Sequence, residues 1–400
     1  MKRKGRILLL GVTVFAVLVL INPYVYGGNR SGVTDNEVNI GIITDLTGPA
    51  AFVGGQVAAS SKVLFKSIND RGGIHGRKIK LYIQDNVYDP VKTIAAAKYL
   101  ITRYDVFAFV NILGSTPVAA LFPLISEEKI PCIAPLNYSS TMYKPFKRYV
   151  FHNTTPAADQ AIIGLDYIMN NWKRHNLKIG VVYADDEMGK DYLKGVRMSQ
   201  KKYGFKIVGA ESVRRRAVDV SSQVINLKRQ GPDYLTVNIG APGVFAAVLK
   251  ERDKLNWPVK LVTACITDTV IKLAGESAHD FYCTTITAEG FEDYPGVANL
   301  RKTSAKYGPK VRVEHIFVWG WTNNLVLIEG LKRAGRDLTR EGLVNALETI
   351  KDFDTGGLIG PITYGLNDRK GVSGARISRA NIKKMKYDHL TGWLKPSIEE

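Results

Sequence analysis

The sequence predicts an α/β protein made of two doubly wound, parallel-sheet lobes. Three observations predict this fold. Strand and helix patterns alternate along most of the chain, they do so in two rounds of similar length, and 400 residues are too many for one hydrophobic core. Alternating strands and helices give parallel sheets that helices cover on both faces. A hydrophobic content of 45% and a charged content of 23% are typical of a globular chain.

The first round supplies five strands and three helices. Val53, Val57, Leu64 and Ile68 recur at helical spacing, which predicts the first helix. A glycine-rich turn ends this helix, and the next segment alternates apolar and polar residues as a half-buried strand does. The predicted strands of this round are 38–44, 79–84, 106–112, 130–134 and 148–152, and the predicted helices are 52–70, 91–103 and 117–127.

The second round begins with a helix and repeats the same alternation. Its predicted strands are 177–183, 205–211, 233–238, 259–264 and 281–287, and its predicted helices are 157–174, 189–202, 220–230 and 242–255. Beyond it we expect a helix from Phe317 to Ala334, ended by Gly335, and another helix over 340–350. A short strand over 358–364 and a lysine-rich tail complete the chain.

Residues 1–27 have the pattern of a secretory signal peptide. A basic flank with Lys2, Arg3 and Lys4 precedes an apolar run, and small residues follow the run. The mature chain would begin at Gly28, and an uncleaved membrane anchor is the alternative. No cysteine follows the apolar run, which argues against a lipid-anchored protein. The sequence therefore predicts export to the periplasm.

The chain is basic, with a formal charge of +18. The positive residues are spread along its length, and the densest clusters, 214–216 and 383–386, are not interleaved with aromatic residues. This distribution favours solvated surfaces over a nucleic-acid site. No nucleic-acid partner is expected, least of all for an exported protein.

Three cysteines at long spacings indicate neither a zinc site nor a disulfide framework. Cys132 lies in an apolar predicted strand, so we expect it to be buried. Cys265 and Cys283 fall in consecutive predicted strands, which makes a disulfide between them geometrically conceivable. Two buried free thiols are the favoured state of that pair.

No enzyme motif appears in the sequence. The histidines are scattered, and the chain has no nucleophile elbow, no P-loop and no dinucleotide-binding glycine pattern. The acidic triplet Asp185–Glu187 follows a strand, where carboxylates stabilise the positive end of the next helix more often than they bind a cation. We therefore expect no catalytic activity, no cofactor and no metal ion.

Small hydroxyl residues gather at the ends of three first-round strands. In open α/β sheets, ligands bind at the carboxyl ends of the strands. Thr47 follows the first strand, Ser115 and Thr116 follow the third, and 136–140 follows the fourth. Because Ser115 and Thr116 begin a helix, they could hold an anion there, or they could simply cap that helix.

An ordered set of motifs in the first round resembles the leucine/isoleucine/valine-binding family of periplasmic solute-binding proteins. The set comprises Thr44–Pro49, the run Asn69–Lys80 and the run Gln84–Pro90. The resemblance extends from about Val38 to about Gly365. It implies a type I periplasmic-binding-protein fold, in which three chain crossings near 153–156, 285–289 and 363–367 form a hinge.

The resemblance also implies a domain organisation and a function. Lobe 1 would contain 36–153 and 288–362, and lobe 2 would contain 154–287 and 363–400. The protein would be a monomer that captures a small polar solute, such as an amino acid, an amide or a small or aromatic carboxylate, and delivers it to the membrane permease of an ABC importer. A ligand-sensing regulatory protein of the same fold is the alternative.

Relatives hold the ligand's carboxylate with hydroxyl residues of lobe 1. The matching positions here are Ser115 and Thr116, with Asn137, Tyr138 and Ser139 in the next strand-end loop, and Thr47 and Phe52 complete the expected lobe-1 set. Some relatives join the loop before Asp-Pro to the strand end near the ligand by a disulfide. The matching positions here are Tyr88 and Gly114, so that bridge is absent.

The lobe-2 positions depart further from the family's pattern. Met188 stands where relatives often have an aromatic ring, Ala241 lies near the position of a tyrosine of some relatives, and Asp268 is the one candidate for the acid that grips an amino group. Phe317, with Trp319 and Trp321, either packs against the cleft or belongs to the core. A buried ammonium group without a paired carboxylate is disfavoured, so we expect a solute that lacks a free α-amino group.

Overall fold

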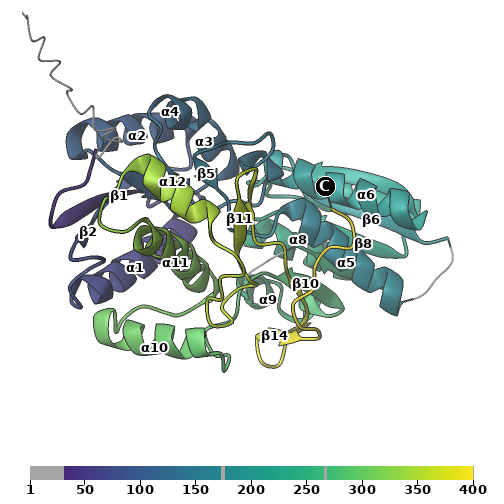
Figure 1. The fold of residues 1–400 in the computed structure, drawn as a ribbon. Coiled ribbons are helices and arrows are strands. Elements are labelled where there is room, and N and C mark those ends of the chain that lie inside the picture. Colours follow the sequence, from purple (N-terminus) through teal and green to yellow (C-terminus); the bar gives the residue numbers. More distant parts are fainter. Residues whose placement is uncertain (1–30, 173–175, 265–267, 400) are drawn as a thin grey trace, which may run out of the picture.

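The computed structural model describes residues 31–172, 176–264 and 268–399. These residues form two lobes, each built on one sheet, as predicted (Figure 1). We call the body on the five-stranded sheet the first lobe and the body on the seven-stranded sheet the second lobe. The predicted signal peptide 1–27 and Cys265 lie outside the described residues. Within the described residues no helix combines the length and the apolar character needed to cross a membrane.

The first-lobe sheet has the order β2-β1-β3-β4-β5, and all its strands are parallel. Its strands are β1 (Glu37–Thr44), β2 (Lys78–Asp85), β3 (Ala108–Val110), β4 (Cys132–Ile133) and β5 (Val150–Phe151). The last three are shorter than predicted. Asn111 and Ala134 adopt φ values of 58° and 48°, and this left-handed backbone ends β3 and β4.

Helices cover both faces of the first-lobe sheet. They are α1 (Ala51–Asn69), α2 (Pro90–Tyr104), α3 (Ser115–Ala119), α4 (Phe122–Glu127), η1 (Ser140–Met142), α10 (Pro295–Tyr307), α11 (His315–Ala334) and α12 (Arg340–Glu348). Successive residues of β3 point to opposite faces: Ala108 joins the apolar cluster under α1 and α11, and Phe109 joins the cluster under α2. Figure 1 shows the late helices α10, α11 and α12 beside the N-terminal elements.

Two helices of the first lobe differ from the prediction. The single helix expected over 117–127 is divided into α3 and α4, because Pro123 has no N–H to continue the hydrogen-bonded ladder. Helix α10 was not predicted. The short helix η1 was not predicted either. The remaining predicted helices begin within a few residues of the expected positions; for example, Asp89 caps α2 by accepting a hydrogen bond from the N–H of Lys92 at 2.8 Å.

The second-lobe sheet has the order β14-β13-β10-β9-β8-β6-β7. Its strands are β6 (Lys178–Ala184), β7 (Lys206–Val213), β8 (Tyr234–Asn238), β9 (Lys260–Thr263), β10 (Phe281–Thr285), β13 (Arg376–Asn381) and β14 (Lys386–His389). Its helices are α5 (Ala157–Asn171), α6 (Glu187–Tyr203), α7 (Ser221–Gln230), α8 (Pro242–Lys254), α9 (Thr269–Ala274) and η2 (Gly275–Ala278).

The lysine-rich tail forms two antiparallel strands that the sequence analysis did not predict. β13 pairs with β10, and β14 pairs with β13 at the edge of the sheet. Lysines on an edge strand keep its unpaired backbone groups from joining another sheet. Tyr387 is the buried residue of β14, so the apolar signal of this strand is a single side chain.

The chain passes between the lobes three times, and the crossing segments are held side by side. Thr155 of the first crossing donates its hydroxyl hydrogen to the carbonyl of Gly374 in the third at 2.6 Å. Arg376, at the end of the third crossing, donates to the carbonyl of Thr287 in the second at 2.9 Å. Arg376 also forms an ion pair with Glu292, with contacts of 2.6 and 2.9 Å. The hinge is therefore a bundle of three hydrogen-bonded segments.

A short hairpin precedes the third crossing. It consists of β11 (Thr363–Gly365) and β12 (Asp368–Gly371), and it contacts α12 and β5 of the first lobe. The expected strand over 358–364 is therefore displaced toward the hairpin. The boundary expected between 362 and 363 also has to move, because the chain returns to the second lobe only after β12.

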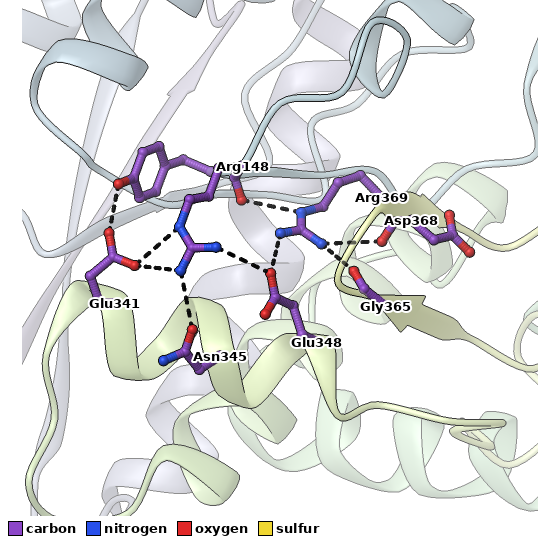
Figure 2. A network of polar contacts seen from close by, with 8 residues as sticks. Arg148, Glu341, Asn345, Glu348, Gly365, Asp368 and Arg369 are labelled. Carbon is purple, nitrogen blue, oxygen red and sulfur yellow. Dashed lines mark hydrogen bonds and ion pairs between the residues drawn. The ribbon is translucent and has the colours of Figure 1, made fainter.

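A buried ion pair attaches this hairpin to the first lobe (Figure 2). Arg369 on β12 contacts the carboxylate of Glu348 on α12, and both side chains are shielded from solvent. Its Nε donates to the carbonyl of Arg148 at 3.1 Å, and its guanidinium group lies 4.3 Å from the ring centre of Phe151. Arg148 in turn donates to Glu341 of α12 at 2.7 Å. Two arginines thus clamp β12 and the segment before β5 onto α12.

Replacement of Arg369 is expected to destabilise the first lobe strongly. Arg369→Met removes the shielded partner of the Glu348 carboxylate and leaves it the half-exposed Arg148, 3.6 Å away, so the loss of unfolding free energy should approach the value of about 3–5 kcal/mol for a broken buried pair. Urea denaturation followed by circular dichroism measures this loss. Lys80→Met is the matched control, because its ion pair with Glu37 is exposed to solvent and contributes little to stability. Equal losses in the two variants would contradict a clamp at Arg369.

Candidate functional site

A cavity of about 540 Å³ lies between the two lobes. Most of its lining is apolar or aromatic. Its polar side chains include the hydroxyl of Ser115, the amide of Asn137 and the guanidinium groups of Arg215 and Arg216. Among the described residues that line it, none carries a carboxylate. The cavity therefore suits a solute with an apolar body and a negatively charged or neutral polar end.

Strand direction places these side chains at the cavity. Ser115 follows β3, Asn137 follows β4, Met188 follows β6 and Arg215 follows β7. These strands are parallel within their sheets, so their carboxyl ends meet at one edge of each sheet. The sequence prediction that strand ends form the site is consistent with this placement.

Six of the residues proposed from the sequence line the cavity. They are Phe52, Ser115, Asn137, Tyr138, Met188 and Ala241. Asn137 has the clearest capacity for a ligand, because its Nδ2 is buried and has no hydrogen-bond partner. A donor in that state is suited to an oxygen of a bound solute.

Three hydroxyl residues of the first lobe are placed outside the lining. Thr47 is exposed and donates to the carboxylate of Asp85 at 2.5 Å. Thr116 is also exposed, one position past Ser115 on α3. Ser139 is fully buried and caps η1, where it accepts a hydrogen bond from the N–H of Thr141. Thr47 and Ser139 thus hold loops beside the cavity.

Two further proposed residues are also placed elsewhere. Asp268 does not line the cavity and forms an ion pair with Lys272 at 2.9 Å. Phe317 is buried in the first-lobe core, where its ring stacks on Trp321. From the same helix, Trp319 reaches the cavity instead, because residues two apart on a helix point to different faces.

Arg215 was not among the site residues predicted from the sequence, and it occupies the second-lobe wall of the cavity. Its Nε forms an ion pair with the carboxylate of Asp186, and its Nη1 donates to the carbonyl of Gly240 at 3.3 Å. Its Nη2 lies 3.8 Å from the sulfur of Met188. Burial disfavours the charge, but Tyr88 and Asp186 raise the pKa of Arg215 above its ordinary value. Arg215 therefore stays a cation.

Tyr88 is the second residue that the sequence analysis did not assign to the site. Its ring lies against Gly114, where a Cβ would come within 3.0 Å of the Cε2 atom of Tyr88. It forms a hydrogen bond with the backbone of Ser115, and the Cζ atom of Arg215 lies 5.8 Å from its ring centre. Burial raises the pKa of Tyr88, so the phenol stays neutral. Tyr88 thus stands between the two lobes.

Two aromatic rings form the floor of the cavity. Tyr138 and Trp319 stack with their centres 4.9 Å apart and an angle of 29° between their planes. The indole N–H of Trp319 donates to the hydroxyl of Thr154 in the first crossing at 3.1 Å. This hydrogen bond fixes the Trp319 ring, so the floor is rigid and connected to the hinge.

A hydrogen bond also joins the lobes beside the cavity. The hydroxyl of Ser140, on η1 of the first lobe, donates to Oδ1 of Asp191, on α6 of the second lobe. Oδ2 of the same carboxylate accepts from the N–H of Ala158 at 3.2 Å. This bond and the Tyr88–Arg215 contact connect the two lobes beside the cavity.

The remaining expectations concern metals, helix starts and cysteines. Within the described part of the chain, no cluster of His, Cys, Asp or Glu could hold a metal ion. The predicted role of the acidic triplet is confirmed at Asp186, which caps α6 by accepting from the N–H of Gly189 at 3.0 Å. Cys132 is buried, as predicted, and burial raises the pKa of its thiol to about 12.

A family model described as a periplasmic binding protein matches residues 37–386. This match covers most of the chain. The chain belongs to the periplasmic binding protein family. The resemblance to the leucine/isoleucine/valine-binding group and the predicted two-lobed fold are thereby confirmed.

Individual relatives agree with this assignment. The Leu/Ile/Val-binding protein homolog 3 of Brucella melitensis is 28% identical over 50% of this chain, and the alignment spans about half of that relative, 53% of its length. A fatty acid ABC transporter substrate-binding protein from Thermomonospora curvata superposes with a TM-score of 0.83, at 23% identity, over 92% of this chain and 95% of its own. A branched chain amino acid ABC transporter from Thermus thermophilus with bound valine gives a TM-score of 0.81, at 22% identity, over 90% and 98%. At these sequence identities, the superpositions show that the fold is shared.

His152 lies behind the first-lobe wall of this binding protein's cavity. Its ring stacks on Tyr143, and its Nε2 bonds to the carbonyl of Asn137 at 3.1 Å. Nδ1 is buried and has no hydrogen-bond partner. Burial lowers the pKa of His152 from 6.5 to about 4, and nearby Lys370 opposes its protonation further. The folded protein therefore keeps this imidazole neutral.

Stability is expected to fall when the pH is lowered from 6.5 to 4. In this window the unfolded chain binds a proton at His152 and the folded chain does not. The unfolding free energy therefore decreases as the pH is lowered. In His152→Gln, whose side-chain amide can still donate to the Asn137 carbonyl, this decrease should be smaller by on the order of 3 kcal/mol. Urea denaturation at pH 7 and pH 4 measures the difference. Equal pH dependence in both proteins would contradict a neutral, buried His152.

Proposed function

We propose that the protein is the extracytoplasmic solute-binding component of an ABC importer, and that its ligand is a carboxylate with an apolar body. One observation carries the choice of ligand. The cavity lining contains two guanidinium groups and, among the described residues, no carboxylate. A buried anion needs a cationic or hydrogen-bonding partner, and a buried ammonium group needs an anionic one. The charges of the cavity therefore favour a carboxylate ligand over an amine.

Arg215 is the proposed partner of that carboxylate. A guanidinium group has five N–H donors, and the contacts with Asp186, Gly240 and Met188 use three of them. One N–H on each terminal nitrogen remains for a ligand. Ser115 and the unpaired Nδ2 of Asn137 supply further donors from the first lobe. A carboxylate between them would be bound by both lobes.

Free leucine, isoleucine and valine fit this cavity less well. Asp268 was the candidate clamp for an ammonium group, but it pairs with Lys272 outside the lining. Met188 replaces the aromatic ring expected of relatives. The solved relative from Thermomonospora curvata carries the name of a fatty-acid-binding protein, and a fatty acid combines a carboxylate with an apolar body. That name supports the proposed ligand class by analogy of fold.

The proposed mechanism is closure of the lobes around the solute. A ligand favours the closed arrangement only through contacts that exist in that arrangement. The moving bodies would be lobe 1, with 36–153 and 288–371, and lobe 2, with 154–287 and 372–400. The three crossings would act as the hinge, and the closed form would be the one that the permease recognises.

The other parts of this proposal come from the sequence and the family. A signal peptide over 1–27 would direct the chain to the periplasm, where it would act as a monomer. It would bind its solute without converting it. A sensory protein of the same fold is the second candidate, and uptake of radiolabelled ligand in a strain that lacks the gene would distinguish transport from sensing.

Carboxylates are expected to bind more tightly than branched-chain amino acids. Benzoate, phenylpropionate, hexanoate and octanoate would be compared with leucine, isoleucine and valine by thermal shift and calorimetry. A ligand at one hundred times its dissociation constant should stabilise the folded form by about 2.7 kcal/mol.

Arg215→Met should weaken carboxylate binding at least about tenfold, since it removes a charged hydrogen bond. Arg214→Met, at an exposed neighbour outside the cavity, should not. Submicromolar leucine binding with no carboxylate binding would overturn the proposal.

Ser115 and Thr116 are expected to differ in their effect on binding. Ser115→Ala removes a hydroxyl from the lining and should weaken binding of the best carboxylate about tenfold or more, because a hydrogen bond to a charged group contributes about 1.5–3 kcal/mol. Thr116→Val alters an exposed side chain outside the lining and should leave the affinity unchanged. Calorimetry on the two variants measures the contrast. A loss in Thr116→Val alone would show that α3 is oriented differently.

A further inference from the structure

A side pocket of about 10 Å³ adjoins the main cavity on the second-lobe side. Tyr138, Met188 and Gly240 line both spaces, so the side pocket extends the main cavity. The ends of β8 and β9, with Asn238 and Thr263, form part of its wall. A space of this volume holds one water molecule or one group of similar size.

Asn238 has hydrogen-bonding capacity that the protein does not use. It is the last residue of β8 and is 5% exposed. Its Oδ1 is buried and has no hydrogen-bond partner. Buried polar atoms in folded proteins are nearly always paired. An acceptor left unpaired next to a ligand cavity indicates that the bound solute supplies the missing donor.

Two other polar side chains of the side pocket, those of Gln160 and Thr263, are already hydrogen-bonded within the protein. Gln160 donates to the carbonyl of Thr155 at 2.7 Å, and its Oε1 accepts from Thr284 at 3.0 Å. Thr263 donates its hydroxyl hydrogen to the carbonyl of Val237 at 2.5 Å. These bonds hold the walls of the pocket in place and leave Asn238 to face the incoming group.

We propose that the side pocket receives a hydroxyl group of the bound solute, which donates its hydrogen to Oδ1 of Asn238. This inference rests on the proposed function and narrows its ligand class to hydroxylated carboxylates. A hydroxyl group has the size of the pocket, and it both donates and accepts, so it pairs with either end of the side-chain amide. An ammonium group fits less well, because no described residue lining either space is a carboxylate.

The test uses pairs of carboxylates that differ by one hydroxyl group. Benzoate, phenylpropionate and hexanoate would be compared with para-hydroxybenzoate, para-hydroxyphenylpropionate and omega-hydroxyhexanoate by calorimetry on the full-length mature protein. In at least one pair the hydroxylated member should bind about tenfold more tightly or better, because a site built around a hydroxyl group rejects the analogue without it.

Variants then assign the preference to Asn238. Asn238→Leu replaces the amide with an apolar side chain of similar shape, and it should abolish the preference while leaving the affinity for the non-hydroxylated member within about threefold. Asn238→Ala serves the same purpose if the leucine variant does not fold. Ser199→Ala is the matched control, because its Oγ is also buried without a partner but lies outside both linings. It should keep the full preference.

The outcomes separate this inference from the proposed function. If carboxylates bind but no hydroxylated member is preferred, the side pocket holds only an ordered water and the inference is wrong. The inference is also wrong if the preference survives in Asn238→Leu, since another group would then read the hydroxyl. If no carboxylate binds, the proposed ligand class fails, and this inference fails with it.

Discussion

The direction of the parallel strands is the constraint on which the rest of this structure depends. Within each sheet the five strands that begin the lobe run the same way, so their carboxyl ends lie along one edge. The loops that follow them meet across the cleft. Ser115 and Arg215 are a hundred positions apart in the chain, yet both line one cavity. Side-chain chemistry at the site can therefore change with the loops while the sheets keep their geometry.

The hinge shows how buried polar groups hold this arrangement together. Thr155 pairs with Gly374, and Arg376 joins the second and third crossings while its charge is met by Glu292. Burial tends to raise the pKa of Glu292, but the hydrogen bonds from His389 and Arg376 outweigh it and lower this pKa to about 2. Because each partner is shielded, breaking one contact would leave another polar group unpaired. The three crossings are thus kept in register with one another.

Much of the fold could be predicted from the sequence, and the failures have physical reasons. Alternating apolar periodicity identified the two rounds of strands and helices. It overestimated β3 and β4 because Asn111 and Ala134 turn into left-handed backbone inside apolar runs. It missed β14 because Tyr387 is that strand's buried residue and lysines occupy much of the surrounding tail. Apolar periodicity predicts which residues are buried. It does not predict where left-handed backbone ends β3 and β4, or that a segment with one buried side chain forms β14.

The candidate site was predicted in part, and what was missed depends on three-dimensional context. Strand-end residues such as Ser115 and Asn137 could be found because topology alone brings them to the cleft. Arg215 could not, because it lies in a run of three arginines whose first member, Arg214, is exposed outside the cavity. Only the structure shows the contacts of Arg215 with Tyr88 and Asp186. The sequence could not show that Trp319 faces the cavity and Phe317 the core, because this depends on how α11 is rotated about its axis.

The Arg215–Asp186 pair explains how a guanidinium group can stay charged beside an apolar cavity and keep donors for the anion that we propose as ligand. Without a partner, a buried guanidinium group would be costly, and Asp186 reduces that cost through Nε. The terminal nitrogens still have N–H groups that face no described acceptor beyond Gly240 and Met188. A carboxylate can therefore add to the pair without displacing Asp186. Arg215 of the second lobe lies over Tyr88 of the first lobe, and Tyr88 bonds to the backbone of Ser115 in its own lobe. An anion bound at this point would therefore add to contacts that join the two lobes, and a ligand favours closure through such contacts.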